Sequence, residues 1–124
     1  MNETTVVNEE NIITNEYYPV LFKLGLKALI RTKSNELIML RDFERVLLDI
    51  KLELAEKERK LILTTNFKEL GLTNEKMRNA YINEQLNDIK VKIDAQNLRI
   101  ASKKDDIEII NDLIKFKELE IKGE

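Results

Sequence analysis

The chain has 124 residues, a net charge of −2, and neither cysteine nor histidine. This length suits one domain. The absence of both residue types excludes thiolate nucleophiles, imidazole bases, disulfides and zinc-finger ligation. We therefore expect a protein that is not an enzyme and that uses no cofactor and no metal.

The composition favours a few long helices. Isoleucine and leucine supply 33 residues, charged residues of both signs make up 35% of the chain, and only 3 glycines and 1 proline are present to form turns. No run of about 18 apolar residues exists that would cross a bilayer, and the acidic N-terminus lacks the positive region of a signal peptide. The sequence predicts a soluble, intracellular protein.

Residues 1–16 are polar, acidic and rich in asparagine and threonine. Such a segment buries too little apolar surface to offset the entropy lost on ordering, so we expect a flexible acidic tail. A short strand or docking segment through Ile12 and Ile13 remains the alternative. Residues 17–124 are expected to form a single helical-hairpin domain.

The segment 17–30 fits two structures. Its apolar residues alternate as in a strand, while Leu21, Leu24 and Ala28 also share one helix face. Pro19 is well placed in a first helical turn, and the next segment is strongly helical, so we favour a short helix over about 19–31.

The segment of about 35–64 is predicted to be a helix with a heptad seam. Residues at alternating spacings of three and four are Leu40, Phe43, Leu47, Ile50, Leu54, Lys57 and Leu61. Six of these seven are apolar, and a stripe with this period stays on one side only if the helix pairs with another. A partner helix is therefore required.

A break follows over 64–72, where Asn66 and Glu69 have capping-box spacing and Gly71 suits a left-handed cap. Thr73 is then expected to cap an uninterrupted helix over about 73–121. Its seam residues are Ile82, Leu86, Ile89, Ile93, Gln96, Ile100, Lys103, Ile107, Ile110, Ile114, Lys117 and Ile121. The polar members of this seam, Gln96, Lys103 and Lys117, are typical of positions that fix register or oligomeric state.

These elements predict an all-α fold, a long antiparallel helical hairpin (coiled coil) with the short N-terminal helix packing at the open end. Folding about 67–70 places Leu61 opposite Met77 and Leu40 opposite Gln96 and Ile100. The same register places 17–30 opposite 107–117, where the last helix is apolar on two faces. So wide a stripe indicates a three-element bundle or self-association, and we expect a homodimer through this end.

Three sets of residues are candidates for contact with a partner. The apolar end of the last helix offers Ile109, Leu113, Phe116 and Leu119. A basic band would comprise Arg31, Lys33, Arg41, Arg99, Lys103 and Lys104. The hairpin tip would present Arg59, Lys60, Lys76 and Arg78. For the basic band, the competing interpretation is that Lys103 points inward at a polar seam position. For the tip, the competing interpretation is that its charged residues are simply hydrated.

The acidic residues Asp105, Asp106 and Glu108 could be read as ligands of a metal ion, but their spacing argues against this. Neighbouring residues in a helix point about 100° apart, so the two aspartates do not converge, and lysines lie within ion-pair reach. We expect a solvated face instead.

The stretch FKELGLTNEKMRNAYINEQL, residues 67–86, resembles small coiled-coil proteins of unknown function from phages and prophages of low-GC Gram-positive bacteria. The resemblance covers the C-terminal half of the chain. It rests on Thr73, Asn74, Glu75, Lys76, Arg78, Ala80 and Tyr81 at the start of a long helix. It implies a phage gene module for recombination or early functions, in the cytoplasm of a bacterial host.

We therefore expect a non-enzymatic protein-binding factor that contacts a host or phage protein. The sharpest version is inhibition of a host nuclease or defence complex such as CRISPR-Cas. The alternative is an accessory nucleic-acid-binding protein of recombination or replication that uses the basic band. Few aromatic residues remain for base stacking, which disfavours this alternative.

Overall fold

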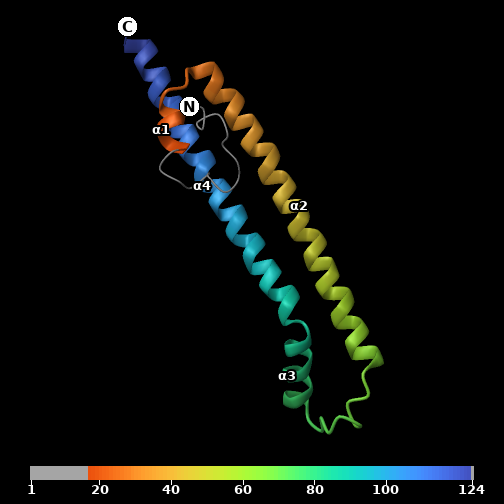
Figure 1. Cartoon of the computed structure of the whole chain (residues 1–124). Helices are drawn as coiled ribbons and strands as arrows, with labels where there is room; N and C mark the ends of the chain where they lie inside the picture. Colours follow the sequence, from red (N-terminus) through yellow and green to blue (C-terminus); the bar gives the residue numbers. More distant parts are fainter. Residues whose placement is uncertain (1–16, 124) are drawn as a thin grey trace, which may run out of the picture. The chain divides into compact units, whose positions relative to one another are not determined.

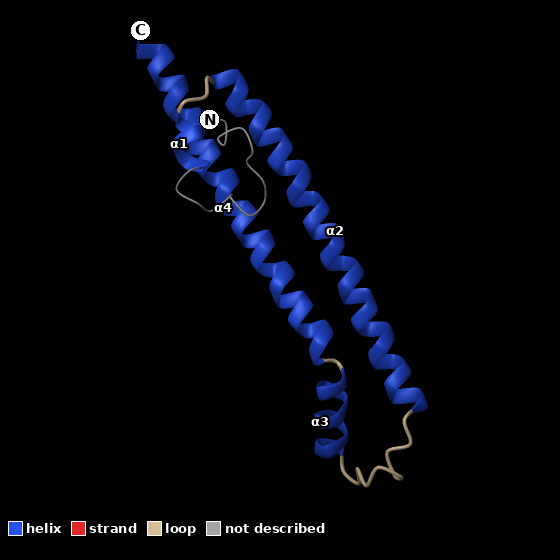
Figure 2. Ribbon diagram, in the orientation of Figure 1, coloured by secondary structure: helices blue, strands red, loops and turns tan. Residues whose placement is uncertain are grey.

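The computed structural model describes residues 17–123, so the expected tail of residues 1–16 lies outside the described part. Within that part the regular elements are all helices (Figures 1 and 2). They are α1 (Tyr17–Phe22), α2 (Leu26–Thr64), α3 (Glu75–Gln85) and α4 (Asn87–Gly123). The long helices α2 and α4 pack against each other as a hairpin, which confirms the predicted all-α helical hairpin. None of the described helices has a stretch long and apolar enough to cross a membrane.

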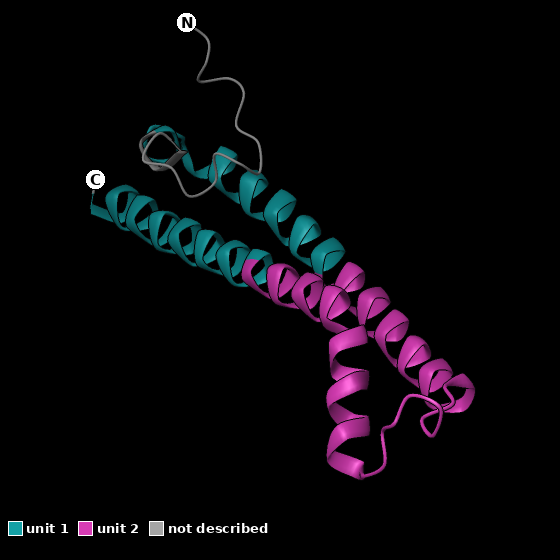
Figure 3. Cartoon of the chain, turned by 60° about the horizontal axis from the view of Figure 1, so that its bottom comes forward, with its two compact units in different colours: residues 1–43, 99–124 teal, residues 44–98 magenta. Residues whose placement is uncertain are grey.

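The chain divides into two compact units, coloured separately in Figure 3. Unit 1 contains residues 1–43 and 99–124, and unit 2 contains residues 44–98. Both α2 and α4 contribute to each unit, and each unit has its own pairing of these two helices.

Unit 1 has a three-element core. Leu21 of α1, Leu29 of α2, and Ile110 and Leu113 of α4 are buried together, and Leu24, Ile109 and Ile114 pack around them. The sequence predicted that residues 17–30 lie opposite 107–117, and the core confirms that pairing. Because α1 covers a second face of α4, isoleucine and leucine fill two sides of this helix rather than one narrow seam.

The boundaries of the first two helices differ from the prediction. The expected break between 31 and 35 is absent. Within the continuous helix, the Thr32 hydroxyl donates to the Ala28 carbonyl at 2.8 Å and the Ser34 hydroxyl donates to the Ile30 carbonyl at 3.2 Å. These side chains are satisfied inside one continuous helix. The break falls instead at residues 23–25, and the Gly25 carbonyl accepts the first bond of α2, from the Leu29 amide at 3.0 Å. Residues 17–22 are helical, so the strand alternative is wrong.

The predicted heptad seams are confirmed. From residue 40 to residue 61 of α2, all positions are exposed except the six apolar seam residues, which are half-buried. These are Leu40, Phe43, Leu47, Ile50, Leu54 and Leu61. On α4 the seam is buried or half-buried from Ile89 to Lys117, and its last member, Ile121, is exposed.

The connection between α2 and α3 lies in unit 2. It contains the predicted left-handed Gly71 and the predicted contact between Asn66 and Glu69, but the helix cap differs from the prediction. Gly71 has a φ of 73°, and the Asn66 side chain accepts a hydrogen bond from the Glu69 amide at 3.2 Å. No helix begins at Asn66, however. The expected cap at Thr73 is also wrong, because the residue that caps α3 is Asn74, whose side chain accepts from the Met77 amide at 2.8 Å.

The predicted third helix is interrupted at Leu86. The amides of Ile89 and Lys90 both donate to the Leu86 carbonyl at 3.1 Å, whereas a regular helix would direct the Ile89 amide to Gln85. The Gln85 carbonyl accepts instead from the Lys57 amine of α2, also at 3.1 Å. The exposed seam lysine therefore caps the end of α3, and this bond compensates the interruption.

The contact made by Lys57 in unit 2 differs from the predicted register. With Leu61 opposite Met77, Lys57 was expected near Tyr81, yet it bonds to Gln85, about one helical turn further along. In unit 1 the register agrees with the prediction, since Lys103 of α4 meets Glu36 of α2.

Candidate protein-interaction surfaces

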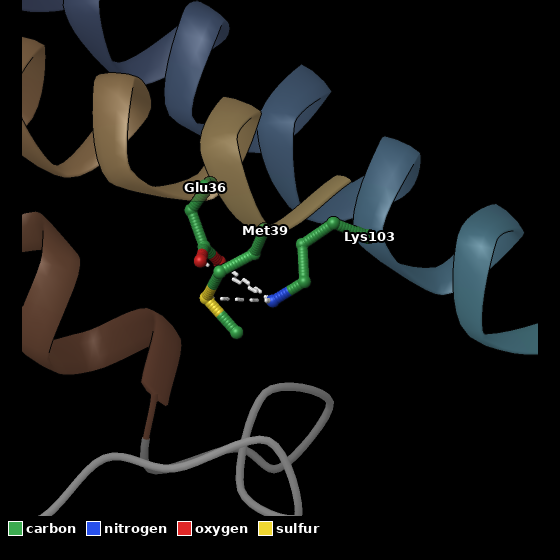
Figure 4. A network of polar contacts seen from close by, with 3 residues as sticks. All are labelled: Glu36, Met39 and Lys103. Carbon is green, nitrogen blue, oxygen red and sulfur yellow. Dashed lines mark hydrogen bonds and ion pairs between the residues drawn. The ribbon is translucent and has the colours of Figure 1, made fainter. Parts of the chain in front are cut away.

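The basic residue at the middle of the predicted band lies inside unit 1. Lys103 is only 1% exposed, and its amine lies 3.2 Å from each carboxylate oxygen of Glu36. The same amine approaches the Met39 sulfur at 3.9 Å and lies 5.8 Å from the centre of the Phe43 ring. Figure 4 shows the Glu36, Met39 and Lys103 side chains converging between α2 and α4. This lysine therefore joins the two helices and is removed from any surface that binds phosphate.

The other members of the band remain at or near the surface of unit 1. Arg31, Arg41, Arg99 and Lys104 are exposed, and Lys33 is half-buried. Lys103 would have linked the basic residues of α4 to those of α2, and it is instead neutralised by Glu36. The predicted band thus loses the cation that made it continuous.

The acidic run on α4 is divided between surface and interior. Asp105 and Glu108 are exposed as expected, but Asp106 is 0% exposed, so the prediction of a fully solvated face is wrong. Asp106 precedes Leu113 by seven residues and shares its helix face, which packs in the unit 1 core. Among the described residues, no three histidine, cysteine, aspartate or glutamate side chains form a group suited to a metal ion.

Of the four residues predicted at the apolar end, two pack inside unit 1 and two are exposed. Leu113 is buried in the unit 1 core and Ile109 packs against it, so these two predicted contact residues hold α1 in place. Phe116 and Leu119 are 50% and 66% exposed, on the last turns of α4. Phe22 of α1 and Ile30 of α2 add further exposed apolar surface to the same unit.

The predicted tip residues are divided between the arms of unit 2. Arg59 and Lys60 are exposed on α2, Lys76 is exposed on α3, and Arg78 is half-buried. Lys60 also lines an open groove with Glu53, Glu56 and Lys57, so two acidic and two basic side chains share it. This mixture of charges does not favour an anionic or a cationic ligand. The loop itself is tied to α3 by Phe67, whose ring meets Tyr81 edge-on at 6.5 Å.

The exposed apolar side chains are the feature that seam analysis missed. Among the described residues, sixteen large hydrophobic side chains are exposed while nine hydrophobic residues are buried. Single apolar residues are common on the surface of a monomer, whereas apolar residues that are neighbours on one face mark contact surfaces. Apart from Ile121, the exposed apolar side chains of α2 and α4 lie off the predicted seams. Three of those on α2, Leu48, Leu52 and Ile62, belong to a second periodic row that is visible in the sequence.

Comparisons with protein-family models, with curated proteins and with solved structures found no match. The fold and its surfaces define an all-α helical-hairpin protein whose described residues present apolar side chains outward.

Proposed function

We propose that the protein is a non-enzymatic binding factor that attaches to another protein through the apolar end of unit 1. The observation that carries this proposal is the exposure of two large apolar side chains, Phe116 and Leu119, on the last turns of α4. Apolar surface of this extent gains free energy when a partner removes it from water.

Phe116 and Leu119 provide the anchor of this surface. They are three residues apart, so they lie side by side on one face of α4. Aromatic and aliphatic anchors of this kind supply most of the affinity in helix-in-groove contacts. Lys117 and Glu120 each follow one of these anchors by one residue and form an ion pair with their charged atoms 3.7 Å apart. Charges beside an apolar contact select among partners.

The sharper form of the proposal is a phage-encoded factor that binds a host or phage protein, with a host nuclease or defence complex such as CRISPR-Cas as the target. Support for this form comes from the resemblance of residues 67–86 to coiled-coil proteins of phages and prophages. The physical argument from unit 1 requires only a protein partner with an apolar groove or helix face.

Affinity capture with variants tests the proposal. The full chain is immobilised and exposed to lysate of a low-GC Gram-positive bacterium, beside a double variant with Phe116→Asp and Leu119→Asp. The control is Leu98→Asp, which places the same charge at an exposed apolar position of α4 in unit 2. We expect a protein that the wild-type chain and the control retain and the double variant loses.

Two results would contradict the proposal. One is capture of the same proteins by the double variant, which would show that the apolar end is not the contact surface. The other is capture that disappears after nuclease treatment of the lysate, which would favour the nucleic-acid alternative.

A further inference from the structure

Helix α2 carries a second periodic row of residues on its outer surface in unit 2. The row is Leu48, Leu52, Ala55, Arg59 and Ile62, with spacings of four, three, four and three. Four of the five are apolar. All five are exposed, and Leu48, Leu52 and Ile62 are exposed to 61%, 67% and 52%.

This row is distinct from the hairpin seam. Leu48, Ala55 and Ile62 each follow a seam residue by one position, and neighbouring residues of a helix point about 100° apart. The seam residues are half-buried while the row is exposed. Heptad spacing on an exposed face has the period that a further helix needs in order to pack along it.

We propose that this row binds a second copy of the same chain, with the two α2 helices antiparallel. In a parallel pair, Arg59 would face Arg59 of the second copy within the contact layer. In an antiparallel pair centred between Leu52 and Ala55, Arg59 lies opposite Leu48 of the second copy instead. The antiparallel arrangement therefore avoids burying two like charges against each other.

The charges beside the row fit the same arrangement. On one flank, Lys51 lies opposite Glu58 of the second copy, and the two-fold symmetry repeats this pair. On the other flank Asp49 lies opposite Glu56 of the second copy, and these like charges repel. Arg59 of the second copy, next to Leu48, is placed to neutralise this acidic pair. The small side chain of Ala55 near the centre allows the helices to approach closely.

Sedimentation equilibrium of the full chain tests the proposal. We expect a dimer, and we expect Leu52→Glu to convert it to a monomer while the helical circular dichroism is unchanged, because Leu52 is exposed in the single chain. Leu98→Glu is the matched control, since Leu98 is 73% exposed on α4 of the same unit and lies outside the row. A monomeric wild-type chain, or a dimer lost in the control and kept in Leu52→Glu, would overturn the proposal.

Cysteine cross-linking tests the orientation, because the chain has no cysteine of its own. A mixture of Lys51→Cys and Glu58→Cys chains is expected to form a disulfide-linked heterodimer, while neither variant alone forms a linked homodimer. A mixture that forms no linked heterodimer would overturn the antiparallel arrangement.

Discussion

The amine of Lys103 lies 3.2 Å from both carboxylate oxygens of Glu36, and both side chains are buried between α2 and α4 of unit 1. Removing two charges from water is costly, and their mutual attraction offsets this cost only when they meet. A slip of either helix by one turn would separate them. The pair therefore penalises every other register of these two helices.

Breaking this pair should destabilise the protein strongly. We expect Lys103→Met to lower the free energy of unfolding by about 3–5 kcal/mol, because it leaves the Glu36 carboxylate buried without its cation. Urea unfolding followed by circular dichroism measures the change.

The double variant with Glu36→Leu and Lys103→Met is the control for this prediction. It replaces the pair by apolar groups and should recover most of the lost stability. If the double variant were as unstable as Lys103→Met alone, packing around the lysine stem, rather than the ion pair, would account for the effect.

Glycine at position 71 should stabilise the fold because of its backbone conformation and not because a side chain would clash there. Its φ is 73°, and no atom lies within 4 Å of the position that a Cβ would take. We expect Gly71→Ala to lower the free energy of unfolding by about 1–2 kcal/mol, the cost of a left-handed conformation for a residue with a side chain. Thermal unfolding of the two proteins measures it.

Gly25 offers the matched comparison. It too has open space around a Cβ, but its φ is not positive. Gly25→Ala should change stability by less than about 1 kcal/mol, because restriction of the unfolded chain opposes the poorer capping by alanine at the start of α2. Equal losses in both variants would mean that the sign of φ is not the cause.

The sequence predicted the helical hairpin because heptad spacing reports directly which face of a helix is covered. The same reasoning placed residues 17–30 against the second apolar face of α4, as Leu21 and Ile110 show in the unit 1 core. It failed at the interruption at Leu86, which no local breaker such as proline marks. There the Gln85 carbonyl accepts a hydrogen bond from Lys57, which lies far away in the sequence.

The candidate sites were harder to predict because charge alone does not show exposure. Lys103 was a candidate member of the basic band, but its inward seam position favoured a role in fixing register, and it is buried. Asp106 was expected on a solvated face, yet it is buried. It lies seven residues before Leu113, on a helix face that packs in the unit 1 core.

The hydrogen bond between the Lys57 amine and the Gln85 carbonyl is expected to contribute to the stability of the protein. Lys57 occupies a position where the seam otherwise has apolar residues, so Lys57→Met would make the seam continuous. We expect the variant to lose about 0.5–1 kcal/mol in the free energy of unfolding, because the bond to the Gln85 carbonyl is lost. Urea unfolding measures the change. A stabilised variant would show that an apolar residue in the seam contributes more than this hydrogen bond.

The start of α3 provides the last prediction. The Asn74 side chain accepts a hydrogen bond from the Met77 amide at 2.8 Å, and the cap residue has the extended backbone typical of this position. We expect Asn74→Ala to cost about 1 kcal/mol, since it leaves an amide of the first turn without that acceptor. Thr73→Ala should have little effect, because the Thr73 hydroxyl contacts the Met77 sulfur at 4.0 Å and bonds none of the helix amides. Urea unfolding of both variants checks the assignment, and a larger loss for Thr73→Ala would place the cap one residue earlier.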